Sequence, residues 1–226
     1  MPHSHRLFGR RQVLAGAAAG AALLPFGALA RAQGLDLASL LESASDGALD
    51  KLAVPGAFYG DKDVRIGLPF AGRSSGLLGS LLGAGERLGL LDGLIRTVNN
   101  AAGAAAGEAK PIFRTAISDI SFSDVPGIVR SGDGGTQYLR GSAHEELHGK
   151  MTPLVDSALG DLGAYNELDA LSEKHSFVRR AGLSRAAMSR TVADQGLDGI
   201  FSYMGKEERA LRANPLKQAG RLLDLF

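Results

Sequence analysis

The stretch LDLASLLESASDGALDKL, residues 35–52, places apolar side chains at the three- and four-residue spacing of one helix face. Pro55-Gly56 follows it, and both residue types commonly mark the end of a helix. The stretch therefore predicts an amphipathic helix, interrupted at Gly47, that packs one face against a core. That face consists of Leu37, Leu40, Leu41, Ala44, Ala48, Leu49 and Leu52.

The same spacing recurs along the rest of the chain, with helices predicted at about 136–150, 153–160, 162–173, 184–204 and 206–212. Only residues 63–69 alternate like a strand, with Val64, Ile66 and Leu68 before Pro69. One strand cannot form a sheet, and the chain shows no fixed-period repeat and no long linker. We therefore predict a single all-α domain over residues 33–226, bundle-like, with about 8–10 helices and one extended segment near 63–69.

Composition narrows the class of protein further. The 226 residues are 45% hydrophobic and 22% charged, which is typical of a folded globular chain. The chain has no cysteine, which excludes disulfides, thiolate metal sites, cysteine nucleophiles and a cysteine-linked lipid anchor. No block is rich in Lys and Arg, so nucleic acid is not an expected partner.

The first 32 residues have the features of a twin-arginine signal peptide. Arg10-Arg11 precedes an apolar run, residues 13–26, that is long enough for a signal-peptide core. The run falls short of the roughly 20 residues that a transmembrane helix needs. We therefore expect the twin-arginine export machinery to carry the folded protein to the periplasm. The alternative is an uncleaved N-terminal anchor.

Small residues offer two cleavage sites for this signal, after Ala30 or after Ala32. Cleavage after Ala32 removes four arginines and no acidic residue, so the formal net charge changes from +1 to −3. The expected mature protein is soluble, mildly acidic and does not span the membrane.

One motif could carry chemistry. His144-Glu145-Glu146-Leu147-His148 fits the HExxH pattern of zinc peptidases, in which two histidines on one helix face share a metal and the adjacent glutamate acts as general base. Glu167, nineteen residues beyond His148, is a possible third ligand. This alternative predicts a zinc-dependent hydrolase. The other interpretation, favoured by the charge of Glu146, is a solvated helix face without a metal.

Two weaker patterns suggest binding. Tyr165 and Asn166 could line a ligand pocket, although such a pair more often packs its ring and caps or bridges helices. The turn SGDGG, residues 131–135, could cradle an anion with its amides, but it lacks the spacing of a phosphate-binding loop, which favours a structural turn.

Leucine is more abundant over residues 77–95 than one helix face requires. A helix that is apolar nearly all round is either fully buried or faces a lipid-like ligand, a membrane or a partner. Burial is the default interpretation, and an apolar binding surface is the alternative.

Short segments along the chain have an order and spacing that are specific when taken together: VRIGLP at 64–69, KPIF at 110–113 with Ala116-Ile117, SFSD at 121–124 with GIV at 127–129, Gly132, Thr136, Tyr138, Pro153, Val155, Tyr165-Asn166, LDGIF at 197–201, and Glu207-Glu208 with Arg212 and Asn214-Pro215. On these segments the chain resembles the bacterial domain-of-unknown-function family 4197 over nearly all of residues 44–226. The resemblance implies a helical, exported envelope protein. It assigns no catalytic residue, because the family's biochemical role is undefined. Members often carry a lipoprotein signal, from which this chain departs.

The leading expectation is therefore a non-enzymatic protein of the periplasm that needs no cofactor. Its expected partner is an apolar small molecule or lipid, an envelope component or a protein. The competing expectation is a zinc hydrolase that uses His144, His148 and Glu167 as ligands and Glu145 as the base.

Overall fold

A computed structural model describes residues 26–69, 86–121, 128, 131–180 and 183–214 of the chain. Every regular element in these residues is helical, so the predicted all-α class is confirmed. The helices are α1 (Phe26–Leu52), α2 (Ala57–Gly60), α4 (Glu86–Glu108), α5 (Lys110–Ser118), α7 (Gly134–Asp161), α8 (Ala164–Lys174), α9 (Ser176–Arg180) and α10 (Arg185–Ala213).

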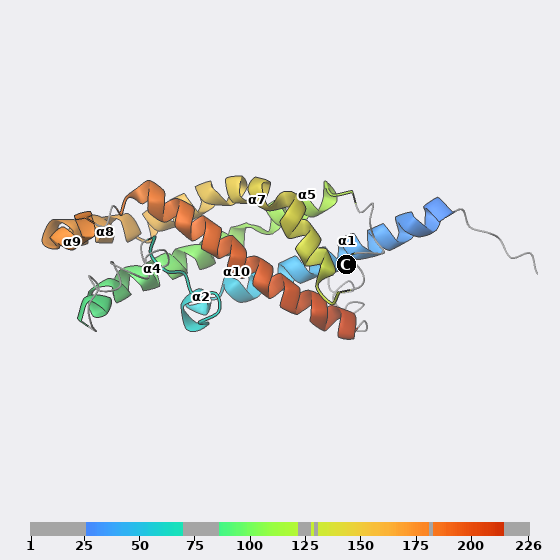
Figure 1. The fold of residues 1–226 in the computed structure, drawn as a ribbon, viewed down its shortest axis with the longest axis horizontal. Coiled ribbons are helices and arrows are strands. Elements are labelled where there is room, and N and C mark those ends of the chain that lie inside the picture. Colours follow the sequence, from blue (N-terminus) through green and yellow to red (C-terminus); the bar gives the residue numbers. More distant parts are fainter. Residues whose placement is uncertain (1–25, 70–85, 122–127, 129–130, 181–182, 215–226) are drawn as a thin grey trace, which may run out of the picture.

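The helices form an elongated bundle around α10, which packs against both α1 and α7 (Figure 1). Helix α4 also packs on α7, and α5 fills the space beside α1. Helices α8 and α9 lie at one end of the bundle, whereas the N-terminal part of α1 projects from the other end (Figure 1).

The core is mostly aliphatic, as expected for a chain with few aromatic residues. Leu41 of α1, Leu94 of α4 and Leu147 of α7 are completely buried. Phe113 of α5 meets Phe201 of α10 edge to face, with ring centroids 6.1 Å apart. The buried apolar residues of these helices belong to one continuous cluster, which holds the bundle together.

Two predicted helix breaks are wrong. Helix α7 continues through Pro153, which is exposed, so the carbonyl group that loses its N–H partner can be hydrated. Helix α10 continues through Gly205, which is buried. A Cβ atom added to this glycine would lie 3.4 Å from the Asp133 carboxylate. Solvent exposure at Pro153 and close packing at Gly205 therefore override the local helix-breaking tendency.

Helix α1 begins at Phe26, upstream of the first predicted helix, and is continuous through Gly47. The expected cleavage sites, after Ala30 and Ala32, both precede Leu37, the first residue of the described core. Cleavage at either position therefore leaves every described core contact in place.

The structure describes only part of the leucine-rich stretch, residues 77–95. Residues 77–85 lie outside the described residues, while Leu91 and Leu94 point into the core. No described helix combines the length and the apolar character needed to cross a membrane.

Candidate functional site

The segment that follows α2 packs in the alternating manner predicted for residues 63–69, although it forms no strand. Val64, Ile66 and Leu68 are buried, whereas Arg65 between them is exposed. The segment begins in a turn at residues 62–64, where the N–H groups of Val64 and Arg65 both donate to the Asp61 carbonyl, so any extended part is shorter than predicted. The segment thus inserts three apolar side chains into the bundle and leaves one arginine outside.

Two amide side chains pair with the backbone of this segment in place of a neighbouring strand. Asn99 of α4 accepts from the Ile66 N–H and donates to the Ile66 carbonyl, both at 2.9 Å. Gln195 of α10 does the same for Gly67, at 2.9 and 3.2 Å. Buried backbone groups need partners, and a primary amide presents one donor and one acceptor in a suitable geometry. These pairs explain how a lone extended segment is stable inside a helical bundle.

Helix α10 approaches the segment closely because residue 199 is glycine. A Cβ at this position would lie 2.9 Å from Cε1 of Phe58 and 3.3 Å from Cβ of Val64. A glycine inside a helix costs roughly 1 kcal/mol relative to alanine, so its presence here has a packing reason. The close approach fixes the position of α2 and the segment on α10.

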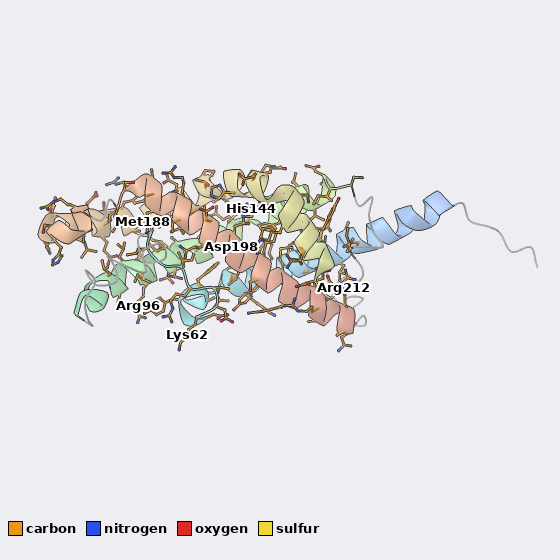
Figure 2. The ribbon with its side chains drawn as sticks, viewed as in Figure 1. Lys62, Arg96, His144, Met188, Asp198 and Arg212 are labelled. Carbon is orange, nitrogen blue, oxygen red and sulfur yellow. The ribbon has the colours of Figure 1, made fainter. Side chains whose placement is uncertain are left out.

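A surface depression of about 200 Å³ lies where the segment meets α10. One side of its lining is Asp63, Val64 and Arg65, and the other is Gln195, Asp198 and Gly199. Asp198, labelled on α10 in Figure 2, pairs with Arg140 of α7. The lining of the depression thus contains two carboxylates, Asp63 and Asp198, and one guanidinium group, Arg65. Two of the segments that carry the family resemblance meet in it.

Hydrogen bonds between tyrosines and carboxylates stabilise the residues around the depression. The Tyr203 hydroxyl donates to Asp61 at 2.7 Å, which raises the pKa of Tyr203 to about 12, with burial as the second cause. The Asp63 backbone N–H and this hydroxyl lower the pKa of Asp61. The Tyr59 hydroxyl donates to Asp92, and this bond raises the pKa of Tyr59 and lowers that of Asp92.

Three of the four tyrosines therefore have a raised pKa, and for two of them, Tyr165 and Tyr203, it reaches about 12. Burial, followed by the hydrogen bond to Asp156, raises the pKa of Tyr165 to about 12, matching Tyr203. Because both folded-state values exceed the ordinary value of 10, the stability they contribute is complete below pH 10 and is lost as pH rises through 12. We expect tyrosinate absorbance of the folded protein to show two groups titrating near pH 12, and only one in Tyr203→Phe. Titration of all four tyrosines together near pH 10 would contradict this.

The HExxH motif lies on α7 with its two histidines in different surroundings. The His144 ring stacks on Phe201, with centroids 6.3 Å apart and planes 20° apart. Oδ1 of Asp194 lies 3.0 Å from Nε2 of His148, but the two groups are not aligned as a hydrogen bond. Glu145 points into solvent, 3.9 Å from Nδ1 of His144.

Glu167, the possible third ligand, lies against α4 instead. Its Oε2 accepts from the Thr97 hydroxyl at 3.1 Å, and its Oε1 lies against Gly93. Across the described ranges, no three His, Asp or Glu residues converge as a metal site. The geometry therefore does not assemble the donor set on which a zinc hydrolase would depend.

Tyr165 and Asn166 do not line a common surface. Tyr165 is buried, donates its hydroxyl to Asp156 and lies under the Arg185 guanidinium, which is 5.2 Å from the ring centroid. Asn166 is exposed. The pair thus divides between the core and the surface: the Tyr165 ring is packed, whereas Asn166 lies on the outside.

The last residue of SGDGG, Gly135, and the next residue, Thr136, bind an anion with their amides at the start of α7, but the anion belongs to the same chain. The Glu208 carboxylate, completely buried, accepts from the backbone N–H groups of Gly135 and Thr136 at 3.0 and 2.7 Å. A Cβ on Gly135 would lie 3.0 Å from this carboxylate and 2.9 Å from Leu41. The interpretation as a structural turn fits this arrangement.

In the sequence, the residues that line the depression stand out only because they belong to segments that carry the family resemblance. No sequence motif marks them as a site. A buried helical glycine such as Gly199 is a usable signal, because it indicates close approach of another element. Asn99 and Gln195 carry no such signal, since their partners lie 33 and 128 positions away.

Comparison with known proteins gives one match. A family model described as "Protein of unknown function (DUF4197)" matches residues 31–226, which is most of the chain. No curated protein and no solved structure matches.

Proposed function

Because the chain belongs to DUF4197, a family of proteins of unknown function, its role has to be inferred from its own residues, and we propose a non-enzymatic binding protein of the periplasm. In this proposal the twin-arginine machinery exports the protein. The depression between the extended segment and α10 then binds a polypeptide partner in the envelope.

The observation that supports this proposal is the polar character of the depression. Among the described residues, the large apolar side chains that are strongly exposed are Val54 and Leu162. An apolar ligand would need an apolar cavity or groove, whereas this depression presents Asp63, Arg65 and Asp198. Of the three partner classes that the sequence suggests, a charged polypeptide therefore matches the surface best.

Position-specific crosslinking in cells tests the proposal. A photoreactive phenylalanine replaces Asp63 or Asp198 in the full-length chain, and Glu173, exposed on α8, serves as the matched control position. We expect one adduct of defined mass from the two depression positions and none from the control. Adducts that are identical at all three positions, or absent at both depression positions, would overturn the proposal.

The same experiment tests the location. The change of Arg10-Arg11 to Lys-Lys should block twin-arginine export, because both guanidinium groups belong to the signal. We expect the precursor to stay in the cytoplasm and the adduct to disappear. An adduct that persists in the cytoplasmic fraction would place the partner there instead.

A further inference from the structure

Two guanidinium groups lie over one aromatic ring beside the depression. The Cζ atoms of Arg65 and Arg96 lie 4.4 and 4.2 Å from the centroid of the Tyr59 ring. Three different elements supply these residues, namely α2, the extended segment and α4. We call Tyr59, Arg65 and Arg96 the tyrosine clamp; Figure 2 labels Arg96 on the side of the molecule where α2 lies.

Hydrogen bonds fix the orientation of both guanidinium groups. Nε of Arg65 donates to the Tyr59 carbonyl at 2.5 Å, and Nε of Arg96 donates to Asp92 at 2.7 Å. In the described part of the chain, both side chains thus use Nε and their planar face for internal contacts, and Arg96 also forms a side-chain hydrogen bond with Tyr59. An external acceptor would therefore meet mainly the terminal amino groups of Arg65. The Tyr59 hydroxyl and Arg96 both bind Asp92, so the Asp92 carboxylate balances the charge of Arg96. The net positive charge of the clamp therefore resides at Arg65.

We propose that the tyrosine clamp binds two neighbouring acidic side chains of the polypeptide partner, an inference that rests on the proposed function. A guanidinium fork matches a carboxylate with two parallel hydrogen bonds. Since both groups lie over the same ring, their centres are less than about 9 Å apart. Acidic side chains one helical turn apart, with Cβ atoms about 5–6 Å from each other, fit that separation.

Charge complementarity favours an acidic polypeptide over an anionic membrane surface. Arg65 belongs both to the clamp and to the depression, whose lining also contains the carboxylates of Asp63 and Asp198. A uniformly anionic surface would meet these two carboxylates as well as the guanidinium groups and would be repelled by them. A polypeptide can place acids on the clamp and basic or neutral groups in the depression.

Fluorescein-labelled hexaglutamate is the probe, and its polarisation is measured with the purified full-length protein at low salt. We expect Arg65→Gln and Arg96→Gln each to weaken binding about fivefold, because each removes one solvent-exposed ionic contact. The matched control is Arg190→Gln, an exposed arginine of α10 whose Nε donates to the Ala186 carbonyl. Hexaglutamate that binds both clamp variants as tightly as the wild type would overturn the proposal.

Two further variants separate a built clamp from net charge. Arg65→Lys keeps the charge but loses the fork and the stacking, and Tyr59→Leu keeps both arginines but removes the ring that orients them. We expect both to weaken binding about as much as Arg65→Gln, and Tyr59→Phe to change it less than twofold. If Arg65→Lys and Tyr59→Leu bind hexaglutamate as tightly as the wild type, the attraction depends on charge alone. That result would overturn the proposal of a built clamp.

Inorganic phosphate and phosphatidylglycerol vesicles complete the comparison. We expect neither probe to bind in a manner that depends on Arg65 and Arg96. Clamp-dependent binding of either probe without binding of hexaglutamate would assign the clamp to a phosphate and overturn the proposal. Because the crosslinking positions, Asp63 and Asp198, lie outside the clamp, an adduct there combined with failure here would leave the proposed function intact.

Discussion

Replacing Glu208 with alanine is expected to lower the free energy of unfolding by about 3–5 kcal/mol, the cost of breaking a buried ionic contact. The carboxylate is completely buried and accepts five hydrogen bonds. Three come from the first turn of α7, where Gly135 and Thr136 donate, and two come from the Arg212 guanidinium. Its removal leaves the N–H groups at the α7 N-terminus without an acceptor and leaves Arg212 without its counter-charge. Urea denaturation followed by circular dichroism measures the loss.

Two other variants make this first result interpretable. Glu146→Ala is the matched control, because Glu146 is exposed and, among the residues that the structure describes, pairs with Lys150 one turn away, so its loss should stay within about 0.5 kcal/mol. If Glu208→Ala does not fold, Thr136→Val removes one hydroxyl donor and should cost about 1 kcal/mol. A Glu208→Ala protein as stable as Glu146→Ala would refute the role of this carboxylate.

Replacing Asn99 with leucine is expected to cost about 3 kcal/mol of stability and to release the extended segment. Leucine has nearly the same shape but cannot pair with the Ile66 N–H and carbonyl, so two buried backbone groups lose their partners. The measurement is urea denaturation together with limited trypsin digestion, which should become faster at Lys62 and Arg65.

The neighbouring residue supplies the control for this second result. Asn100 is exposed and accepts one hydrogen bond, from the Gly56 N–H at 3.2 Å. Asn100→Leu should therefore change stability by less than about 1 kcal/mol and leave digestion unchanged. Equal effects of the two substitutions would mean that the segment is held by its apolar side chains alone.

The fold class was predictable because helix periodicity is a local property. The seven residues of the apolar face predicted between Leu37 and Leu52 are all buried, as the spacing over residues 35–52 predicts. The breaks at Pro153 and Gly205 were wrongly predicted for the opposite reason. Whether a proline or glycine ends a helix depends on solvent exposure and on neighbouring helices, which local sequence does not reveal.

The candidate site was less predictable because its parts are distant in the sequence. The HExxH motif suggested a metal on local spacing, whereas the positions of Glu167 against Thr97 and of His148 beside Asp194 depend on how four helices pack. The depression was equally hard to predict, because Arg65 and Asp198 are separated by more than half of the chain. Only the family resemblance placed both of them in segments of interest.

Residue type and local spacing were enough to predict the helical class, the alternation of Val64, Ile66 and Leu68 and the absence of any cysteine-based chemistry. The sequence also accounts for the expected export signal, whose loss would make the mature chain acidic rather than faintly basic. The tertiary structure alone decided which polar groups meet. Asn99 and Gln195 pair with the backbone of one segment, Glu208 with the start of α7, and two arginines with Tyr59. Hydrogen bonds and ionic contacts depend on distances of a few ångströms between side chains from different helices, and those distances are set only when the helices pack.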